Sequence, residues 1–279
     1  MLLLLTFLFP VSAQALSLAT DTHWQGSLRF DAGVRVEKGA TLSVAPGTRV
    51  EFAGGALEVF GSLHARGARF EGEDWQGIVL RDGESRMEDC AVLGARTGVL
   101  VLGADPGIIG NQFTGNEIAI KAQGAARPIL VGNQISGGGT GVLLSRRSDA
   151  RLRHNRITGN RIGVQVEHSS YPVIRDNDLS GNAMALVLSR QSSAWEKTRG
   201  AGGRRPVALT GAVDAKNNWW GAAATEELER TAGRGNPSFI HDGRDEPFFT
   251  DEGKTYPLDI VEFAPWRAAP LTLGSGQGR

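Results

Sequence analysis

Asparagine returns every 22 residues through the middle of this chain. The four copies are Asn111, Asn133, Asn155 and Asn177. A fixed period of this length is typical of stacked structural units, each of which is too small to bury its own apolar face. An asparagine side chain buried in a bend can accept a hydrogen bond from a backbone amide and donate one to a carbonyl. The four asparagines therefore predict a structural ladder that holds successive units in register.

Apolar residues follow each asparagine at fixed distances of two, nine and eleven residues. The three sets are Phe113, Ile135, Ile157 and Leu179; Ile120, Val142, Val164 and Leu186; and Ala122, Leu144, Val166 and Leu188. The second and third sets are two residues apart, which is the side-chain period of a β-strand. Glycines at 115, 137, 159 and 181 lie between the first two sets, where they allow a sharp corner. The pattern predicts an all-β chain coiled into a parallel solenoid whose apolar sets face inward.

A leucine-rich repeat is the competing architecture, because Leu152, Asn155 and Ile157 fit the end of its signature. That signature requires a leucine five residues before each asparagine. The residues at this position are Pro128, Ala150 and Pro172. The pattern therefore favours the solenoid of strands.

The solenoid is expected to span residues 16–221 in roughly nine coils, with small caps at both ends. Asp89 and Gly67 take the asparagine place upstream of Asn111 at the same spacing. The next asparagine after Asn177 is 41 residues away, at Asn218, so residues 190–206 contain an insertion. We expect this insertion to be a mobile loop that overhangs one face of the solenoid.

Residues 222–279 are expected to form a C-terminal cap and tail with one short helix at 225–232. Glu226 and Glu227 at its start and Gly233 after its end match helix-end signals. Trp219 and Trp220 stand where the repeats stop. Because the exposed end of a solenoid has to be covered, we interpret both tryptophans as capping residues. Stacking of these rings against a sugar is the alternative interpretation.

Several strings in the chain resemble the right-handed parallel β-helix repeat proteins, which are secreted and periplasmic bacterial members of the pectate-lyase-like superfamily. The strings lie at residues 155–164, at 39–52 followed by 75–78, and at 213–221 with a closing FAPW at 263–266. The resemblance implies the right-handed parallel β-helix fold. The superfamily mixes lyases, hydrolases, epimerases and non-enzymes, among them the nitrous-oxide-reductase accessory protein, so the resemblance implies no single reaction.

The first fifteen residues have the pattern of a secretory signal peptide. An apolar run at 2–9 precedes small residues at 11–15, although the usual basic start is missing. The run is too short to span a bilayer, so we expect no transmembrane anchor and predict export to the periplasm or the exterior. The single cysteine, Cys90, excludes an internal disulfide. Lysine and arginine balance aspartate and glutamate at 30 each, so no broad field favours nucleic acid.

Thirteen positions after each of the last three asparagines stands an arginine or a histidine, and a glycine stands thirteen after the first. This column, which we name the corner column, consists of Gly124, Arg146, His168 and Arg190. Two arginines on either side of a histidine, with Glu167 beside it, can hold an acidic sugar and move a proton. We therefore predict a ligand-binding set of Arg146, Glu167, His168 and Arg190. A solvated rim of charges at the end of a strand is the alternative interpretation.

Candidate catalytic residues come from the same part of the chain. They are Glu167, His168, Asp176 and Asp178, because a glycosidase needs two carboxyl groups at a suitable separation. We interpret Arg153 and Arg175 as partners of carboxylates on neighbouring coils. The signature strings of polygalacturonases, pectate lyases and pectin esterases are absent, and so is the Gly-x-Ser-x-Gly elbow. These absences favour a protein that binds rather than one that catalyses.

No cofactor is expected, because the five histidines are scattered and no metal-ligand spacing occurs. Calcium at Asp242 and Asp245 is an alternative, although the spacing is not that of an EF-hand. The leading hypothesis is an exported, non-catalytic protein that binds a glycan or an envelope protein along its solenoid face. The alternatives are a polysaccharide lyase, epimerase or hydrolase that acts on acidic sugars, and a periplasmic accessory protein of a metal enzyme.

Overall fold

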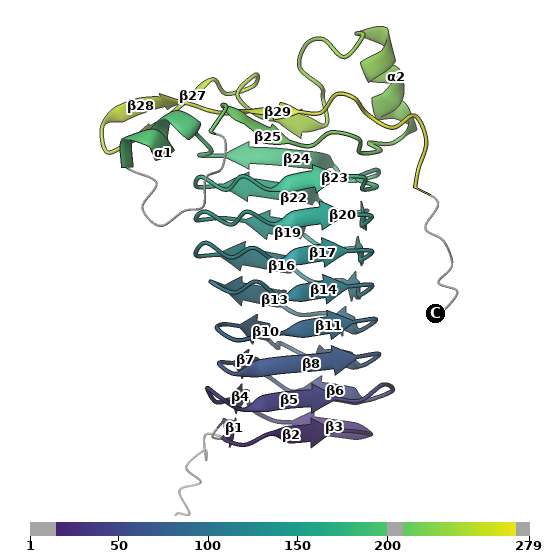
Figure 1. The fold of residues 1–279 in the computed structure, drawn as a ribbon. Helices are drawn as coiled ribbons and strands as arrows, with labels where there is room; N and C mark the ends of the chain where they lie inside the picture. Colours follow the sequence, from purple (N-terminus) through teal and green to yellow (C-terminus); the bar gives the residue numbers. More distant parts are fainter. Residues whose placement is uncertain (1–14, 200–208, 272–279) are drawn as a thin grey trace, which may run out of the picture.

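Three parallel β-sheets run the length of the molecule and enclose a single apolar core (Figure 1). The computed structural model describes residues 15–199 and 209–271. Within these residues the chain passes through the first, second and third sheets in turn and then starts the next coil. The predicted parallel solenoid is confirmed.

The first sheet has ten strands in the described chain, namely β1 (Leu16–Leu18), β4 (Val34–Val36), β7 (Ala56–Val59), β10 (Gly77–Leu80), β13 (Thr97–Leu102), β16 (Ile118–Gln123), β19 (Thr140–Leu144), β22 (Ile162–Glu167), β24 (Met184–Ser189) and β26 (Ile240–His241). The second sheet has ten as well, namely β2 (Thr22–Trp24), β5 (Thr41–Val44), β8 (Ser62–Arg66), β11 (Arg86–Glu88), β14 (Gly107–Ile109), β17 (Ile129–Val131), β20 (Arg151–Arg153), β23 (Val173–Arg175), β25 (Ala212–Asp214) and β29 (Ile260–Glu262).

The third sheet contains β3 (Ser27–Phe30), β6 (Arg49–Phe52), β9 (Arg69–Gly72), β12 (Ala91–Leu93), β15 (Gln112–Thr114), β18 (Gln134–Ser136) and β21 (Arg156–Thr158). Asp178 and Trp219 continue this sheet through single bridges on the next two turns. Seven turns of the described chain therefore carry a strand in all three sheets, and two more are completed by a bridge. This arrangement agrees with the expected count of roughly nine coils.

The core consists of the inward-facing residues that the repeat predicted. Phe113, Ile135 and Ile157 pair in register across the third sheet, and each is at most 1% exposed. In the first turns the core is aromatic instead. Trp24, Phe30, Phe52 and Trp75 form a continuous stack with ring centroids 4.9 to 5.5 Å apart.

The period changes by one residue before Asn111, which corrects one register assignment. Ala91 pairs with Gln112, so Cys90, and not Asp89, lies in the ladder position. Likewise Ala91 donates its N–H to Ala68, which places Ala68 there one turn earlier in place of Gly67. Asp89 and Gly67 occupy the preceding corner, where both have positive φ. A period of 22 residues cannot be extended upstream because this turn is one residue shorter.

The C-terminal end of the solenoid carries two helices and a hairpin (Figure 1). These are α1 (Ser193–Arg199), α2 (Ala222–Arg230) and the antiparallel pair β27 (Phe248–Asp251) and β28 (Lys254–Pro257). Helix α2 starts three residues before the predicted helix and ends two residues earlier. Alanine has the highest helix propensity, and Ala222, Ala223 and Ala224 form the first turn. Glu226 and Glu227 therefore lie beyond the first turn rather than at the start.

The insertion at 190–206 is not wholly a loop, because residues 193–199 form α1. The Ser192 hydroxyl accepts a hydrogen bond from the Trp195 N–H at 3.2 Å, which caps this helix. The rest of the predicted loop, at 200–206, lies outside the described residues. Strands β26 and β29 follow the predicted boundary at 221 and extend the first and second sheets.

Candidate functional site

The asparagine ladder is buried between the second and third sheets. Asn133 donates from its backbone N–H and from Nδ2 to Oδ1 of Asn155, at 3.0 and 2.9 Å. Asn155 makes the same two bonds to Asn177, and its Nδ2 also donates to the Leu130 carbonyl. Asn177 continues the ladder to Asn218 across the insertion. The amide groups of these side chains make hydrogen bonds to neighbouring turns, which confirms the structural ladder that the repeat predicted.

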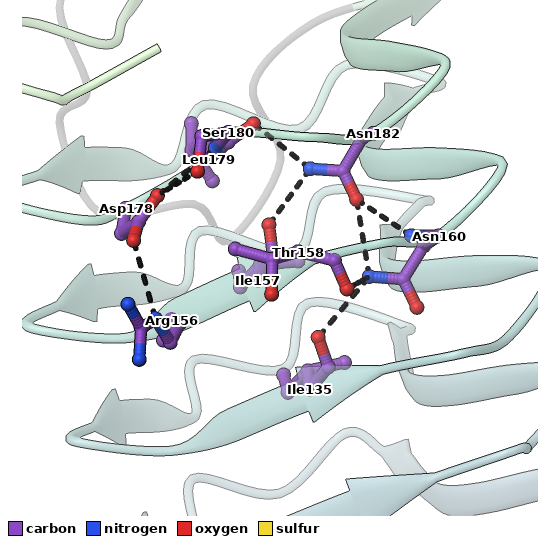
Figure 2. A network of polar contacts seen from close by, with 9 residues as sticks. All are labelled: Ile135, Arg156, Ile157, Thr158, Asn160, Asp178, Leu179, Ser180 and Asn182. Carbon is purple, nitrogen blue, oxygen red and sulfur yellow. Dashed lines mark hydrogen bonds and ion pairs between the residues drawn. The ribbon is translucent and has the colours of Figure 1, made fainter. Parts of the chain in front are cut away.

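A second amide ladder lies at the corner between the third and first sheets (Figure 2). The backbone N–H and Nδ2 of Asn160 donate to Asn182 Oδ1 at 2.9 and 3.1 Å. Asn182 Nδ2 in turn donates to the carbonyls of Ile157 and Leu179. Each glycine before this position has positive φ, between 66° and 70°. Both ladders fix the register of the later turns from inside.

The corner column lies where the chain leaves the first sheet. Gly124, Arg146, His168 and Arg190 all have left-handed backbones, with φ values of 75°, 53°, 51° and 49°. Arg146 and Arg190 are exposed, and His168 lies on the turn between them. The same turn shape thus stacks these side chains on successive coils. The structure brings this predicted set together.

Glu167 is the last residue of β22 and lies beside His168. His168 Nδ1 is 3.5 Å from Glu167 Oε1, and Gln165 Nε2 is 3.4 Å from Glu167 Oε2. The Glu167 side chain is 22% exposed and that of His168 is 40% exposed. A carboxylate and an imidazole in contact at a partly exposed corner can exchange a proton with a bound molecule. Their catalytic role stays a prediction.

The insertion at 190–206 contacts Arg147, the residue that follows Arg146 of the corner column. Arg147 Nε lies 3.0 Å from Glu196 Oε1, and the Glu196 side chain on α1 is fully buried. Ser193 donates its N–H to Asp259, which also accepts from the Tyr171 hydroxyl at 2.8 Å. Burial is the main cause that raises the pKa of Asp259. These contacts fix α1 above the end of the corner column.

The other two predicted catalytic residues, Asp176 and Asp178, lie away from Glu167. Strand β23 separates them from Glu167 in the chain. Asp178 is 4% exposed, and it accepts from the backbone N–H and the hydroxyl of Ser180 and pairs with Arg156 at 3.3 Å (Figure 2). Asp176 pairs with Arg267 at 3.5 Å. The structure therefore does not place either carboxylate beside Glu167.

On the outer face of the second sheet, sequence reasoning missed Arg151, and its predicted carboxylate pairing holds for Arg175 but is wrong for Arg153. Arg151 and Arg153 are exposed on β20 and point to the same side, because they are two residues apart on one strand. Neither has an ion pair within the described residues. Arg175, one turn on, binds Asp214 through Nε and Nη2 at 2.5 to 3.2 Å, as the predicted pairing between coils requires. The useful signal is a carboxylate on the neighbouring turn of the second sheet, which Arg175 finds at Asp214 across the insertion and Arg153 lacks.

Ion pairing of arginine differs sharply along the solenoid. Between residues 27 and 117, six of eight arginines pair with a carboxylate in the structure. Between residues 118 and 190, three of nine do so within the described chain. We name four exposed members of the remainder the unpaired arginine set: Arg146, Arg151, Arg153 and Arg190.

A comparison with models of protein families identifies the family of this chain. A family model described as "Right handed beta helix region" matches residues 58–198. The chain belongs to the right-handed β-helix family. A search of curated proteins and a search of solved structures each returned no match. Family membership gives the handedness of this β-helix, and it is compatible with both catalytic and non-catalytic roles.

The described residues of the β-helix contain neither a metal-ligand cluster nor a helix that could span a membrane. No group of three or more histidine, cysteine or acidic residues lies close enough there to hold a metal ion. Asp242 is fully buried, and its carboxylate accepts from the N–H groups of Arg244 and Val261. No helix in the described ranges is long and apolar enough to cross a membrane.

Proposed function

We propose that this β-helix is exported and binds acidic polysaccharide, without chemical conversion, along the unpaired arginine set. The observation that carries the proposal is the concentration of guanidinium groups without carboxylate partners on turns seven to nine. Guanidinium binds carboxylate through two parallel N–H···O bonds, so it suits a chain of uronate groups. Successive coils lie about 4.8 Å apart, so the three arginines of the seventh turn and Arg190 of the ninth lie about 10 Å apart along the rod axis.

Export is part of the proposal and rests on residues 1–15, of which 1–14 lie outside the described residues. Their apolar and small-residue pattern is that of a signal peptide. An envelope or extracellular location would bring the protein to acidic glycans. Mass spectrometry of the N-terminus after secretion tests this step, and an unprocessed N-terminus in the cytoplasm would contradict it.

The binding test uses immobilised polygalacturonate, with neutral dextran as the uncharged control. Arg146→Ala/Arg190→Ala, combined with Arg151→Ala/Arg153→Ala, is expected to weaken binding about tenfold or more, which corresponds to ~1.4 kcal/mol. The matched control Arg29→Ala/Arg35→Ala removes arginines that already pair with Glu51 and Glu58. Equal loss in both variants would contradict the assignment, and so would equal binding to dextran.

A second candidate function is a lyase, epimerase or hydrolase acting on the same acidic sugars. The contact between Glu167 and His168, with arginines on both neighbouring turns, favours it. The assay measures unsaturated and reducing products released from a panel of uronate polymers. Product that disappears in Glu167→Gln supports catalysis, whereas binding without product supports the non-catalytic role.

An envelope protein is a further candidate partner, favoured by aliphatic residues beside the unpaired arginine set. Ile129 is 44% exposed and pairs in register with Arg151, and Val131 pairs with Arg153. Ile129→Ser, which adds no charge beside Arg151, is expected to weaken binding of a protein partner at least tenfold and to leave binding of polygalacturonate within about twofold. The metal-accessory alternative has no observation in its favour among the described residues, and titration with copper tests it.

A further inference from the structure

Helix α2 begins without a capping group. Its N-cap residue is Gly221, which has no side chain, and no acidic residue lies in the first turn. The backbone N–H groups of Ala222, Ala223 and Ala224 have no acceptor among the described residues. Free N–H groups and the helix dipole together give this end a partial positive charge.

This helix start opens into a cavity of about 490 Å³ at the C-terminal end of the solenoid, which we name the cap cavity. One wall is the first turn of α2, and a second is the glycine corner from Ser180 to Asn182. Trp219, Trp220 and Phe239 add aromatic surface. Figure 2 shows Ser180 and Asn182 at this corner, where Asn182 is the last residue of the second amide ladder.

Two buried indole groups in the same cavity lack hydrogen-bond partners. Trp219 is 9% exposed and Trp220 is 3% exposed. The Nε1–H of each has no acceptor within the described residues. A buried N–H without a partner is unfavourable, and tryptophan usually finds one. An acceptor oxygen bound in the cavity would provide the missing partner.

The cavity also contains one carboxylate, that of Glu227. Its two oxygens accept from the backbone N–H and the hydroxyl of Ser238, at 2.8 and 2.6 Å. Each oxygen retains a lone pair for a further donor. The cavity thus combines N–H donors at one end, an acceptor for hydroxyl groups and an aromatic wall.

We propose that the cap cavity binds a small hydroxylated carboxylate, of the sugar-acid class. The ligand's carboxylate lies at the start of α2 and accepts from its free N–H groups. The hydroxyl groups donate to Glu227, one ligand oxygen accepts from the Nε1–H of Trp219, and the C–H face packs against the aromatic wall. Figure 1 shows α2 and α1 on opposite sides of the last turns, so this site is separate from the corner column.

The test is isothermal titration calorimetry of the exported protein with galacturonate and with galactose. Galacturonate is expected to bind at one site at least tenfold more tightly than the neutral sugar, because hydrogen bonds to a charged group are the stronger ones. Trp219→Phe removes one indole N–H, and a loss of about threefold to tenfold is expected from the lost bond. Trp195→Phe is the matched control on α1.

A second variant guards against misfolding of the first. Ala222→Pro removes a single N–H at the first position of α2, where proline is tolerated. It is expected to weaken galacturonate binding at least threefold with an unchanged circular dichroism spectrum. Equal affinity for the two sugars, no saturation by about 10 mM galacturonate, or full binding in both variants would overturn the proposal. Loss of galacturonate binding in the Arg146→Ala/Arg190→Ala variant instead would assign the ligand to the corner column.

Discussion

The early and late turns of the solenoid share one fold but carry opposite charge. Residues 27–117 contain nine basic and thirteen acidic residues, whereas residues 118–178 contain nine basic and four acidic ones. The neutral total of the chain conceals this division. A positive electrostatic potential on one half of a rod attracts an acidic partner to that half, although the whole molecule has no net charge.

The two regions are also held together differently. The early turns carry the stacked aromatic core and ion pairs across coils, such as Arg35 with Glu58 at 2.9 Å. The late turns carry two buried amide ladders and an aliphatic core. Because buried amides fix the register of the late turns, the surface arginines are not required for it. An unpaired charge is therefore most informative about binding on turns whose register does not depend on ion pairs.

The largest effect is expected from the late ladder. Asn155→Ala leaves the buried N–H of Asn133 without its acceptor and removes the side-chain bond to the Leu130 carbonyl, so we expect a loss of about 2–4 kcal/mol in the free energy of unfolding. Urea denaturation measures it. Gln134→Ala, exposed on the adjacent strand, is the control and is expected to change stability by less than about 0.5 kcal/mol. A loss of stability no larger than that of the control variant would contradict a stabilising role of the asparagine ladder.

The next effect comes from extending the ladder into the early turns. Cys90 is buried in the ladder position, and burial is the main cause that raises the pKa of its thiol. Cys90→Asn provides an Nδ2 donor for Asn111 Oδ1, so we expect a gain of about 1 kcal/mol in stability. Cys90→Ala, which adds no donor, is expected to destabilise. Lower stability of the asparagine variant than of the alanine variant would contradict the shared geometry.

A smaller effect is expected when the early turns are given unpaired arginines. Glu58→Gln/Glu71→Gln removes the carboxylate partners of Arg35, Arg49 and Arg69. Polygalacturonate binding at low salt is expected to rise about threefold, because exposed charge pairs contribute under about 1 kcal/mol each. Surface plasmon resonance measures it, with dextran as the control. Unchanged binding would show that free guanidinium groups alone do not create affinity.

The smallest effect is a pH dependence of stability in the early turns. The hydrogen bond from Arg69 is the largest cause that lowers the pKa of Glu71 below 4.5, with Arg49 adding to it. Because the pKa of Glu71 is lower in the folded than in the unfolded state, its carboxylate stabilises the fold at pH values above the unfolded-state pKa. This stabilisation is lost as the pH falls through the folded-state pKa. Glu71→Gln is therefore expected to be less stable than wild type at pH 7, by under about 1 kcal/mol. Chemical denaturation at pH 7 and pH 3 would contradict this if the gap widened in acid.

The sequence predicted the parts of this fold that repeat. A period of 22 residues fixes the register, and the strand period then decides which side chains face inward, so the ladder from Asn111 to Asn177 and its apolar sets followed directly. The register before Asn111 did not follow, because one shorter turn shifts the ladder position to Cys90.

Contacts between distant segments were not predictable in the same way. Helix α1 lies in an insertion without periodicity, and the spacing of Ser193 and Glu196 would suggest a capping box one residue after the true cap at Ser192. The pair of Arg147 with buried Glu196 joins residues 49 apart, which no local pattern reveals. The corner column was found because it repeats, whereas the cap cavity forms only where helix α2 returns to the last turns.

The most direct test of the account is chemical footprinting of arginine with phenylglyoxal, with and without polygalacturonate. We expect protection of Arg146, Arg151, Arg153 and Arg190, and unchanged labelling of Arg29 and Arg35 on the early turns. Arg161, exposed at the opposite corner of the late turns, is the internal control and is expected to stay reactive. Protection spread evenly over early and late turns, or binding without protection of the four arginines, would contradict the account.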